Sequence, residues 1–236
     1  MNNKTLEQAI DTTQRYVQQY YPTASLVLLC GSWARHYAHE DSDIDLFVVD
    51  EAVEELRFAG VLFDTWLIEV CALAPQRIEE LFAAAAYNRS APVPHQVVDG
   101  MVIRGKSNFV EQIQALARNT LAAGPLPLTD AEIIELRWTL TMLLHDLRHV
   151  SAGELPALAA QCYTQFAQAA IDSVSGWHGD RKTLRRALIV VEPEYAAALD
   201  DALIAAIHGD RQPLLTSGHQ VLERFGGSLR TYLERY

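Results

Sequence analysis

Hydrophobic and polar positions follow two different patterns along the chain. Residues 5–20 carry apolar side chains at a three-to-four-residue spacing, which predicts an amphipathic helix with Thr5 or Asn3 as its N-cap. Short apolar runs then alternate with turns rich in Gly, Asp, Pro and Ser, as is typical of β-strands. The predicted strands are residues 25–30, 44–49, 61–70 and 97–103. Two more helical patterns, from Pro75 to Tyr87 and over 107–122, complete a mixed α/β arrangement.

The pattern changes at residues 124–130, GPLPLTD, where two prolines and a glycine interrupt the periodicity and predict a linker. Thr129 or Asp130 then caps a long helix that runs to residue 150. The only strand-like run beyond it is LIVVE, residues 188–192. The other predicted helices of this half are 154–174, 181–189, 193–207 and 212–235. We therefore expect two domains: residues 1–123, with a short mixed sheet flanked by helices, and residues 124–236, an all-α helical bundle.

Composition narrows the function classes. The chain has 19 Lys and Arg against 30 Asp and Glu, a net charge of −11, which disfavours nucleic acid as a partner because that affinity comes mainly from cations on phosphates. A cationic substrate fits this charge better. No apolar run approaches the roughly 18 residues of a membrane helix, so no membrane partner is expected. Cys30, Cys71 and Cys162 lack CxxC spacing, which argues against a zinc site or a disulfide framework and favours a cytoplasmic location.

The chemistry concentrates in residues 26–50, LVLLCGSWARHYAHEDSDIDLFVVD. Asp43 and Asp45 are two positions apart at the start of a strand, so their carboxylates project from the same face. Two neighbouring carboxylates repel each other unless a cation lies between them, and oxygen ligands favour Mg²⁺. Gly31 lets the backbone approach a ligand closely, and Ser32 offers hydroxyl and amide donors to a phosphate.

This segment, GSWAR followed by SDIDLFVV, resembles the signature of the nucleotidyltransferases of the DNA polymerase β superfamily. The resemblance covers roughly residues 1–106. It implies that Asp43 and Asp45 bind two Mg²⁺ ions and that Gly31 and Ser32 hold the phosphates of a nucleoside triphosphate, with ATP as the expected donor. It also implies a third carboxylate on a neighbouring strand.

Asp64 and Glu69 are the two candidates for this third carboxylate. They are five positions apart, so on one regular strand they face opposite sides and only one can join the site. Glu69 lies in an apolar run, where a carboxylate needs a partner or a proton to take, whereas Asp64 lies nearer the strand edge. The segment IEV also resembles the third-acid strand of the aminoglycoside nucleotidyltransferases, where a glutamate is the general base. Glu69 is therefore favoured as metal ligand and base, with Asp64 left open.

Three cations are candidates for nucleotide contacts. Arg35 follows the Gly-Ser turn closely, and its alternative role is a surface salt bridge to Glu40 or Asp41. Lys182 and Arg185 belong to the basic segment 177–186, which resembles runs in the helical C-terminal domains of antibiotic nucleotidyltransferases. In those domains a basic residue reaches the triphosphate. The alternative is a solvated, basic helix start.

For the acceptor, the helical half offers the carboxylates of Glu135, Asp146 and Asp172, which would suit a polycation. We expect a nucleotidyltransferase that moves a nucleoside monophosphate, AMP in the first instance, from an NTP to a hydroxyl of a small molecule such as an aminoglycoside-like antibiotic. Two alternatives remain open: a toxin that modifies tRNA or a protein, and a non-catalytic nucleotide-binding module. The resemblance also allows a homodimer, because similar enzymes complete the active-site cleft with a second subunit.

Overall fold

The computed structural model describes residues 4–231 and divides the chain after Ala123 into two compact units, the second beginning at Gly124. Each unit has its own hydrophobic core. The roles that the sequence suggested for the two halves stay predictions.

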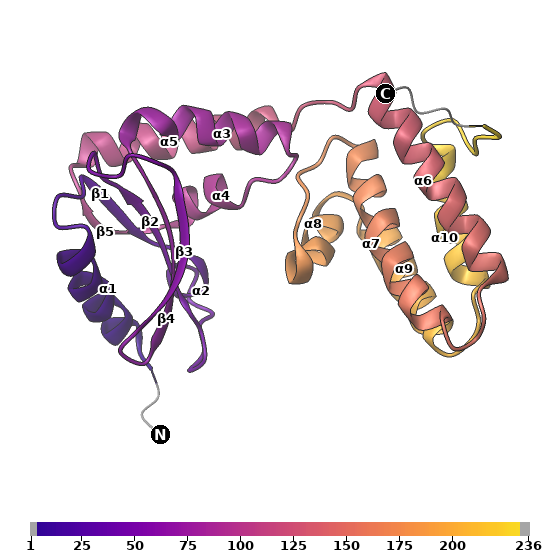
Figure 1. Ribbon diagram of the computed structural model, residues 1–236, viewed down its shortest axis with the longest axis horizontal. Helices are drawn as coiled ribbons and strands as arrows, with labels where there is room; N and C mark the ends of the chain where they lie inside the picture. Colours follow the sequence, from indigo (N-terminus) through magenta and orange to yellow (C-terminus); the bar gives the residue numbers. More distant parts are fainter. Residues whose placement is uncertain (1–3, 232–236) are drawn as a thin grey trace. The chain divides into compact units, whose positions relative to one another are not determined.

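The first unit is built on a five-stranded mixed sheet, coloured indigo to magenta in Figure 1. The strands are β1 (Leu26–Leu29), β2 (Ile44–Val49), β3 (Arg57–Phe63), β4 (Trp66–Leu73) and β5 (Met101–Gly105). Their order is β3-β4-β2-β1-β5; β2 and β4 run parallel, and every other neighbouring pair is antiparallel. The predicted mixed α/β class is therefore confirmed.

Helices cover both faces of this sheet. They are α1 (Leu6–Tyr20), α2 (Gly31–Ala34), a 3₁₀ turn (Pro75–Arg77), α3 (Ile78–Tyr87), α4 (Pro92–Asp99) and α5 (Ser107–Ala123). The buried side of α1 packs on one face, against alternate residues of β1, β2 and β4. The other alternate residues of these strands pack against α3, α4 and α5 (Figure 1). Because successive strand residues point to opposite faces, β1 and the end of β2 are apolar at every position.

Two of the predicted strands were wrong in extent. The run 61–70 is not one strand but the end of β3, a turn at Asp64 and Thr65, and the start of β4. The β-rich residues on both sides masked the turn, which Asp64 makes with a φ of +53° rather than with a glycine. In the run 97–103, Val97 belongs to α4, and β5 begins at Met101 after Gly100.

Within residues 124–231 every regular element of the second unit is a helix. It contains α6 (Asp130–His149), α7 (Leu155–Ser173), a 3₁₀ turn (Arg181–Thr183), α8 (Leu184–Val191), α9 (Pro193–Ile207) and α10 (Gln212–Glu223). Thr129 caps α6 in a reciprocal arrangement with Glu132, as the sequence predicts. The strand-like run 188–192 instead continues α8, because Leu184 and Leu188 share one buried helical face.

Helix α10 ends at Glu223, well before the predicted residue 235. Gly226 and Gly227 follow it with φ angles of +98° and +75°, and Arg137 on α6 donates hydrogen bonds to both of their carbonyl oxygens. The left-handed glycines turn the chain away from the helix axis. Residues 232–235 of the predicted helix lie outside the described residues.

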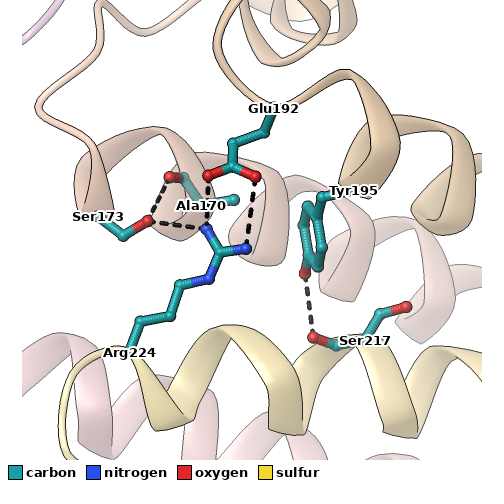
Figure 2. A network of polar contacts seen from close by, with 6 residues as sticks. All are labelled: Ala170, Ser173, Glu192, Tyr195, Ser217 and Arg224. Atoms are coloured by element: carbon teal, nitrogen blue, oxygen red, sulfur yellow. Dashed lines mark hydrogen bonds and ion pairs between the residues drawn. The ribbon is translucent and has the colours of Figure 1, made fainter.

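A polar network ties three helices of this unit together (Figure 2). Arg224 donates to the Glu192 carboxylate at 3.0 Å and to Ser173 Oγ at 3.0 Å, and Tyr195 donates to the Ser217 carbonyl at 3.0 Å. The Arg224 guanidinium also lies 5.3 Å from the centre of the Tyr195 ring. These contacts join the ends of α7, α9 and α10, so we assign them a structural role. No helix among residues 4–231 is both long and apolar enough to cross a bilayer.

Candidate metal centre

Three carboxylates meet on the face of the sheet that α3, α4 and α5 partly cover. Asp45 on β2 pairs directly with Glu69 on the parallel strand β4, and Asp43 lies two residues before Asp45. One carboxylate oxygen from each of the three residues lies within 4.8 Å of the others. Asp43 and Asp45 are half-buried and Glu69 is exposed, so the cluster is accessible from solvent on the Glu69 side.

The strand alternation positions these acids. Ile44 lies between the two aspartates in the sequence, and Ile68 directly precedes Glu69. Both isoleucines face the opposite side of the sheet and are fully buried in the core that includes α1. A register shift of one residue would bury the carboxylates and expose the isoleucines, so the core fixes the register. The Trp33 indole donates to the Asp43 carbonyl at 2.9 Å and thereby anchors the backbone that carries the first carboxylate.

Gly31 lies directly against the Asp45 carboxylate. Its φ is +65°, and a Cβ added there would lie 1.8 Å from Asp45 Oδ2 and 2.8 Å from its Cγ. The backbone amide of Cys30, just before it, donates to the Asp45 carbonyl at 2.8 Å. Only glycine fits this approach, for both conformational and steric reasons.

Ser32 has a buried hydroxyl with no hydrogen-bond partner among the described residues. A buried unsatisfied hydroxyl costs free energy, and such groups in folded proteins normally have a partner. Ser32 follows Gly31, which lies against the Asp45 carboxylate, so this unsatisfied hydroxyl belongs to the turn beside the cluster.

The donor set fits a divalent metal ion. Three carboxylates this close repel one another, and this repulsion is relieved by a bound cation. All the donors are hard oxygens, which suit Mg²⁺ or Mn²⁺ rather than a thiolate-preferring metal. Asp43, Asp45 and Glu69 could therefore hold a metal ion; they are the one such group of His, Cys, Asp and Glu found in the described part of the chain.

Asp64 lies elsewhere. It occupies the turn between β3 and β4 and accepts a hydrogen bond from Arg15 of α1 at 2.5 Å. The prediction that Asp64 and Glu69 share one strand was wrong, because a turn separates β3 from β4 at Asp64. Glu69, and not Asp64, lies beside the two aspartates.

Arg35 is close to the site but has a different partner from those considered. Its Nε lies 3.6 Å from Asp99 at the end of α4 and donates to the Gly31 carbonyl at 3.4 Å. The ion pair is therefore with Asp99 and not with Glu40 or Asp41. Helix α2 is four residues long, and Arg35 is its C-cap.

The other two candidate cations belong to the second unit. The Arg185 guanidinium pairs with Asp200 at 2.7 Å, and Tyr163 donates to the same carboxylate at 2.8 Å. Lys182 is exposed and forms no salt bridge within residues 4–231. A nucleotide contact by either residue stays a prediction.

The acidic residues suggested for a cationic acceptor differ in their surroundings. Asp172 is almost buried and its carboxylate contacts His178 Nε2 at 2.8 Å. Asp146 lies 3.5 Å from His145 on the same helix, and Glu135 is exposed. Asp172 therefore serves a contact inside its own unit.

A pocket of about 420 Å³ adjoins the carboxylates and was missed from the sequence. Asp45 and Glu69 form one wall, β3 contributes Phe58 and Gly60, and α4 contributes Val93. Strand β3 begins at Arg57, four residues before the Val61 at which the predicted strand started, so Phe58 and Gly60 fell outside the prediction. Helix α4 carries two prolines in its first turn, and this composition hid it.

Cys71 also lines this pocket, yet it is not a nucleophile. Burial raises the pKa of its thiol to about 12. A thiolate is therefore scarce at neutral pH, and the residue acts as part of the apolar wall. Burial raises the pKa of Cys30, behind Asp45, in the same direction.

No family model and no curated protein matches this sequence. Among solved structures, the chain is similar to a nucleotidyltransferase-like protein from Exiguobacterium sibiricum 255-15, with a TM-score of 0.45 and 14% sequence identity. The alignment covers 91% of this chain and 74% of that chain. A similarity with an identity and a TM-score this low assigns no function to this chain.

Proposed function

We propose that the protein is a nucleotidyltransferase that moves a nucleoside monophosphate, AMP in the first instance, from an NTP to a hydroxyl group of a small molecule. The observation that carries the proposal is the cluster of Asp43, Asp45 and Glu69, with Gly31 packed against one of its carboxylates. This is an oxygen-ligand site beside a close-approach glycine and an unpartnered hydroxyl, as a metal-bound triphosphate requires.

Each residue has a defined task in this reaction. Asp43 and Asp45 would hold Mg²⁺, and Glu69 would complete the ligand set. Bound divalent cations would supply charge neutralisation at the α-phosphate and align the attacking and leaving oxygens. The Ser32 hydroxyl would donate to a phosphate oxygen and so gain the partner that the protein itself does not provide.

Glu69 would also take the acceptor proton. It is the exposed member of the cluster, whereas both aspartates are half-buried. A carboxylate at the open side can come within hydrogen-bond reach of an incoming hydroxyl. The acceptor oxygen then forms a bond to the α-phosphorus, the α–β phosphoanhydride bond breaks, and pyrophosphate leaves.

The experiment is a pyrophosphate-release assay with ATP and Mg²⁺ across neutral alcohols, aminoglycosides, lincosamides and a tRNA mixture. We expect acceptor-dependent pyrophosphate release with a small molecule, abolished in Asp45→Asn while the variant stays folded. Activity retained by Asp45→Asn would contradict the metal assignment. Pyrophosphate release with tRNA alone would favour the macromolecular alternative, and nucleotide binding without release under any condition would favour a non-catalytic module.

Glu69→Gln refines this test. We expect turnover to fall by about 10²–10⁴ with little change in nucleotide affinity, since a general base acts on the chemical step. Asp64→Asn is the matched control, because it removes another carboxylate of the β3–β4 hairpin, one that accepts a hydrogen bond from Arg15 and lies outside the cluster. A larger loss in Asp64→Asn than in Glu69→Gln would contradict the placement of the base.

A further inference from the structure

The pocket beside the carboxylates occupies a defined position relative to the phosphate side of the site. Strand register places a row of residues across the sheet: Gly31 after β1, Asp45 on β2, Glu69 on β4 and Gly60 on β3. Asp45 pairs with Glu69, and Glu69 pairs with Gly60. Ser32 therefore lies at one end of this row and the pocket at the other, with the carboxylates between them.

This order matches the geometry of an in-line displacement. The leaving pyrophosphate and the attacking hydroxyl lie on opposite sides of the reacting phosphorus. If the phosphates bind beside Ser32, the acceptor must approach from the far side of the carboxylates. Within the first unit, the far side is the pocket of about 420 Å³ formed by β3, β4 and α4.

The lining of the pocket selects the chemical class of the acceptor. Asp45 and Glu69 are its only charged lining residues, and Gln96 is its one amide side chain. Phe58 lines it while remaining 64% exposed, so its ring is accessible to a ligand. Bound Mg²⁺ would neutralise both carboxylates, so the pocket would offer no remaining charge to a polycation.

Apolar surface continues beyond the pocket on the same face. Leu62 and Leu67 pair directly across β3 and β4, two positions beyond the Gly60–Glu69 pair, and are 75% and 47% exposed. Glu69 is thus flanked by exposed apolar side chains at both ends, Phe58 on one side and the two leucines on the other. An aromatic or apolar group laid along this face would cover them.

We propose that this pocket binds the acceptor and that the acceptor is a neutral molecule with an aromatic or apolar ring beside its reactive hydroxyl. The inference rests on the proposed function and departs from the polycationic acceptor that the net charge suggested. The ring packs against Phe58 and Val93, and the hydroxyl reaches Glu69. The acceptor oxygen bonds to the α-phosphorus, its proton passes to the Glu69 carboxylate, and pyrophosphate departs on the Ser32 side.

Gly60 gives a direct test. A Cβ added at Gly60 meets no atom within 4 Å, and the same is true of Gly153 in the turn before α7. A Cβ at Gly60 is therefore tolerated, so Gly60→Leu adds a side chain at the wall of the pocket, and Gly153→Leu is the matched control that adds the same side chain elsewhere. Phe58→Ala is a second pocket variant, on an exposed position of an edge strand, where folding is not at risk.

The measurement is ligand-observed NMR of the full chain with Mg²⁺ and 2-(naphthalen-2-yl)ethanol, a neutral aromatic alcohol. We expect binding by the wild type, affinity weakened at least about tenfold in Gly60→Leu and severalfold in Phe58→Ala, and no change in Gly153→Leu. Kanamycin, a polycation, should not displace the alcohol. Absence of binding, equal binding by Gly60→Leu, or displacement by kanamycin would overturn the proposal.

The pocket and the reaction can fail separately. This binding measurement needs no turnover, so it is independent of the pyrophosphate assay. Binding of the alcohol without pyrophosphate formation under any condition would contradict the transfer reaction and the acceptor role, while the ligand class of the pocket would stand. Pyrophosphate formed with kanamycin and unaffected by Gly60→Leu would support the transfer reaction and overturn the pocket assignment.

Discussion

Replacement of Gly31 by alanine tests the contact on which the geometry of the site depends. The added Cβ would lie 1.8 Å from Asp45 Oδ2, whereas ordinary contacts between non-bonded heavy atoms are about 3.5 Å or more, so the carboxylate or the Gly31 backbone must move by about 1.7 Å. The φ of +65° adds about 1–2 kcal/mol for a residue with a Cβ. Site geometry tolerates only about 0.5 Å, so metal binding should weaken markedly.

The two costs separate in a double-mutant cycle with Asp45→Ala. In the Asp45→Ala background the carboxylate is gone and only the milder contact with the Cβ of residue 45, at 3.1 Å, remains, so Gly31→Ala retains chiefly the backbone cost of about 1–2 kcal/mol. In the wild-type background we expect a total loss of about 2–4 kcal/mol in the free energy of unfolding. Urea denaturation measures the stability terms, and isothermal titration with Mn²⁺ measures metal binding by wild type and Gly31→Ala.

Gly153→Ala is the control for this cycle, because its added Cβ meets open space. It should change stability by less than about 1 kcal/mol. Equal costs of Gly31→Ala in the two backgrounds, within about 0.5 kcal/mol, would refute the reasoning, since the conflict with Asp45 would then contribute nothing. Unchanged Mn²⁺ affinity in Gly31→Ala would contradict the expectation that displacing the Asp45 carboxylate weakens metal binding.

Three further predictions concern other parts of the chain. Ser32→Ala should leave the free energy of unfolding unchanged or raise it by up to about 1 kcal/mol, because it removes an unsatisfied buried hydroxyl. The same variant should bind ATP more weakly in a calorimetric titration. A clear loss of stability would show that the hydroxyl has a protein partner. Arg224→Met should lower the free energy of unfolding by about 1–3 kcal/mol in urea denaturation, because Glu192, only 25% exposed, loses its cation. Adding Glu192→Gln should recover part of this loss. No recovery would contradict the ion-pair explanation. Burial raises the pKa of Cys71 and of Cys162 to about 12, so at pH 8 about one thiol in 10⁴ is ionised, against about one in four for an ordinary cysteine. Iodoacetamide should therefore leave both cysteines unmodified in the folded protein and alkylate them in urea, as mass spectrometry would show; rapid labelling of the folded protein would contradict their burial.

The sequence predicted the strongly periodic elements well. Helix α1 and strand β2 lie within a residue of their expected bounds, because a capping box and a buried apolar run are local signals. The change from mixed α/β to helical structure at residues 124–130 was also readable, since Pro and Gly interrupt both periodicities. The two-residue spacing of Asp43 and Asp45 needed only the strand period.

What the sequence did not predict depends on contacts between distant residues. The pairing of Asp45 with Glu69 follows from a parallel β2–β4 register, which no local pattern encodes. Arg35 pairs with Asp99 because α4 lies beside α2 in the fold, whereas sequence proximity pointed to Glu40 and Asp41. The β3–β4 turn was missed because Asp64 takes a left-handed conformation without the usual glycine signal.

The net charge of −11 and the lining of the pocket indicate different acceptor classes. It suggested a polycationic acceptor, yet the pocket beside Glu69 has no charged lining residue apart from the two carboxylates of the metal cluster. Most of the acidic residues lie far from these three in the chain. Charge summed over a whole chain describes solubility and long-range attraction, whereas substrate class follows from the few residues around the reacting atoms.

The central claim is that Asp43, Asp45 and Glu69 bind the metal ions of an NTP-dependent reaction. It is tested most directly by anomalous diffraction from crystals grown with Mn²⁺ and α,β-methylene-ATP. The account predicts anomalous peaks bounded by these three carboxylates, with a phosphate oxygen within hydrogen-bond distance of the Ser32 hydroxyl. Metal and nucleotide bound elsewhere, with the three carboxylates lacking Mn²⁺, would contradict it.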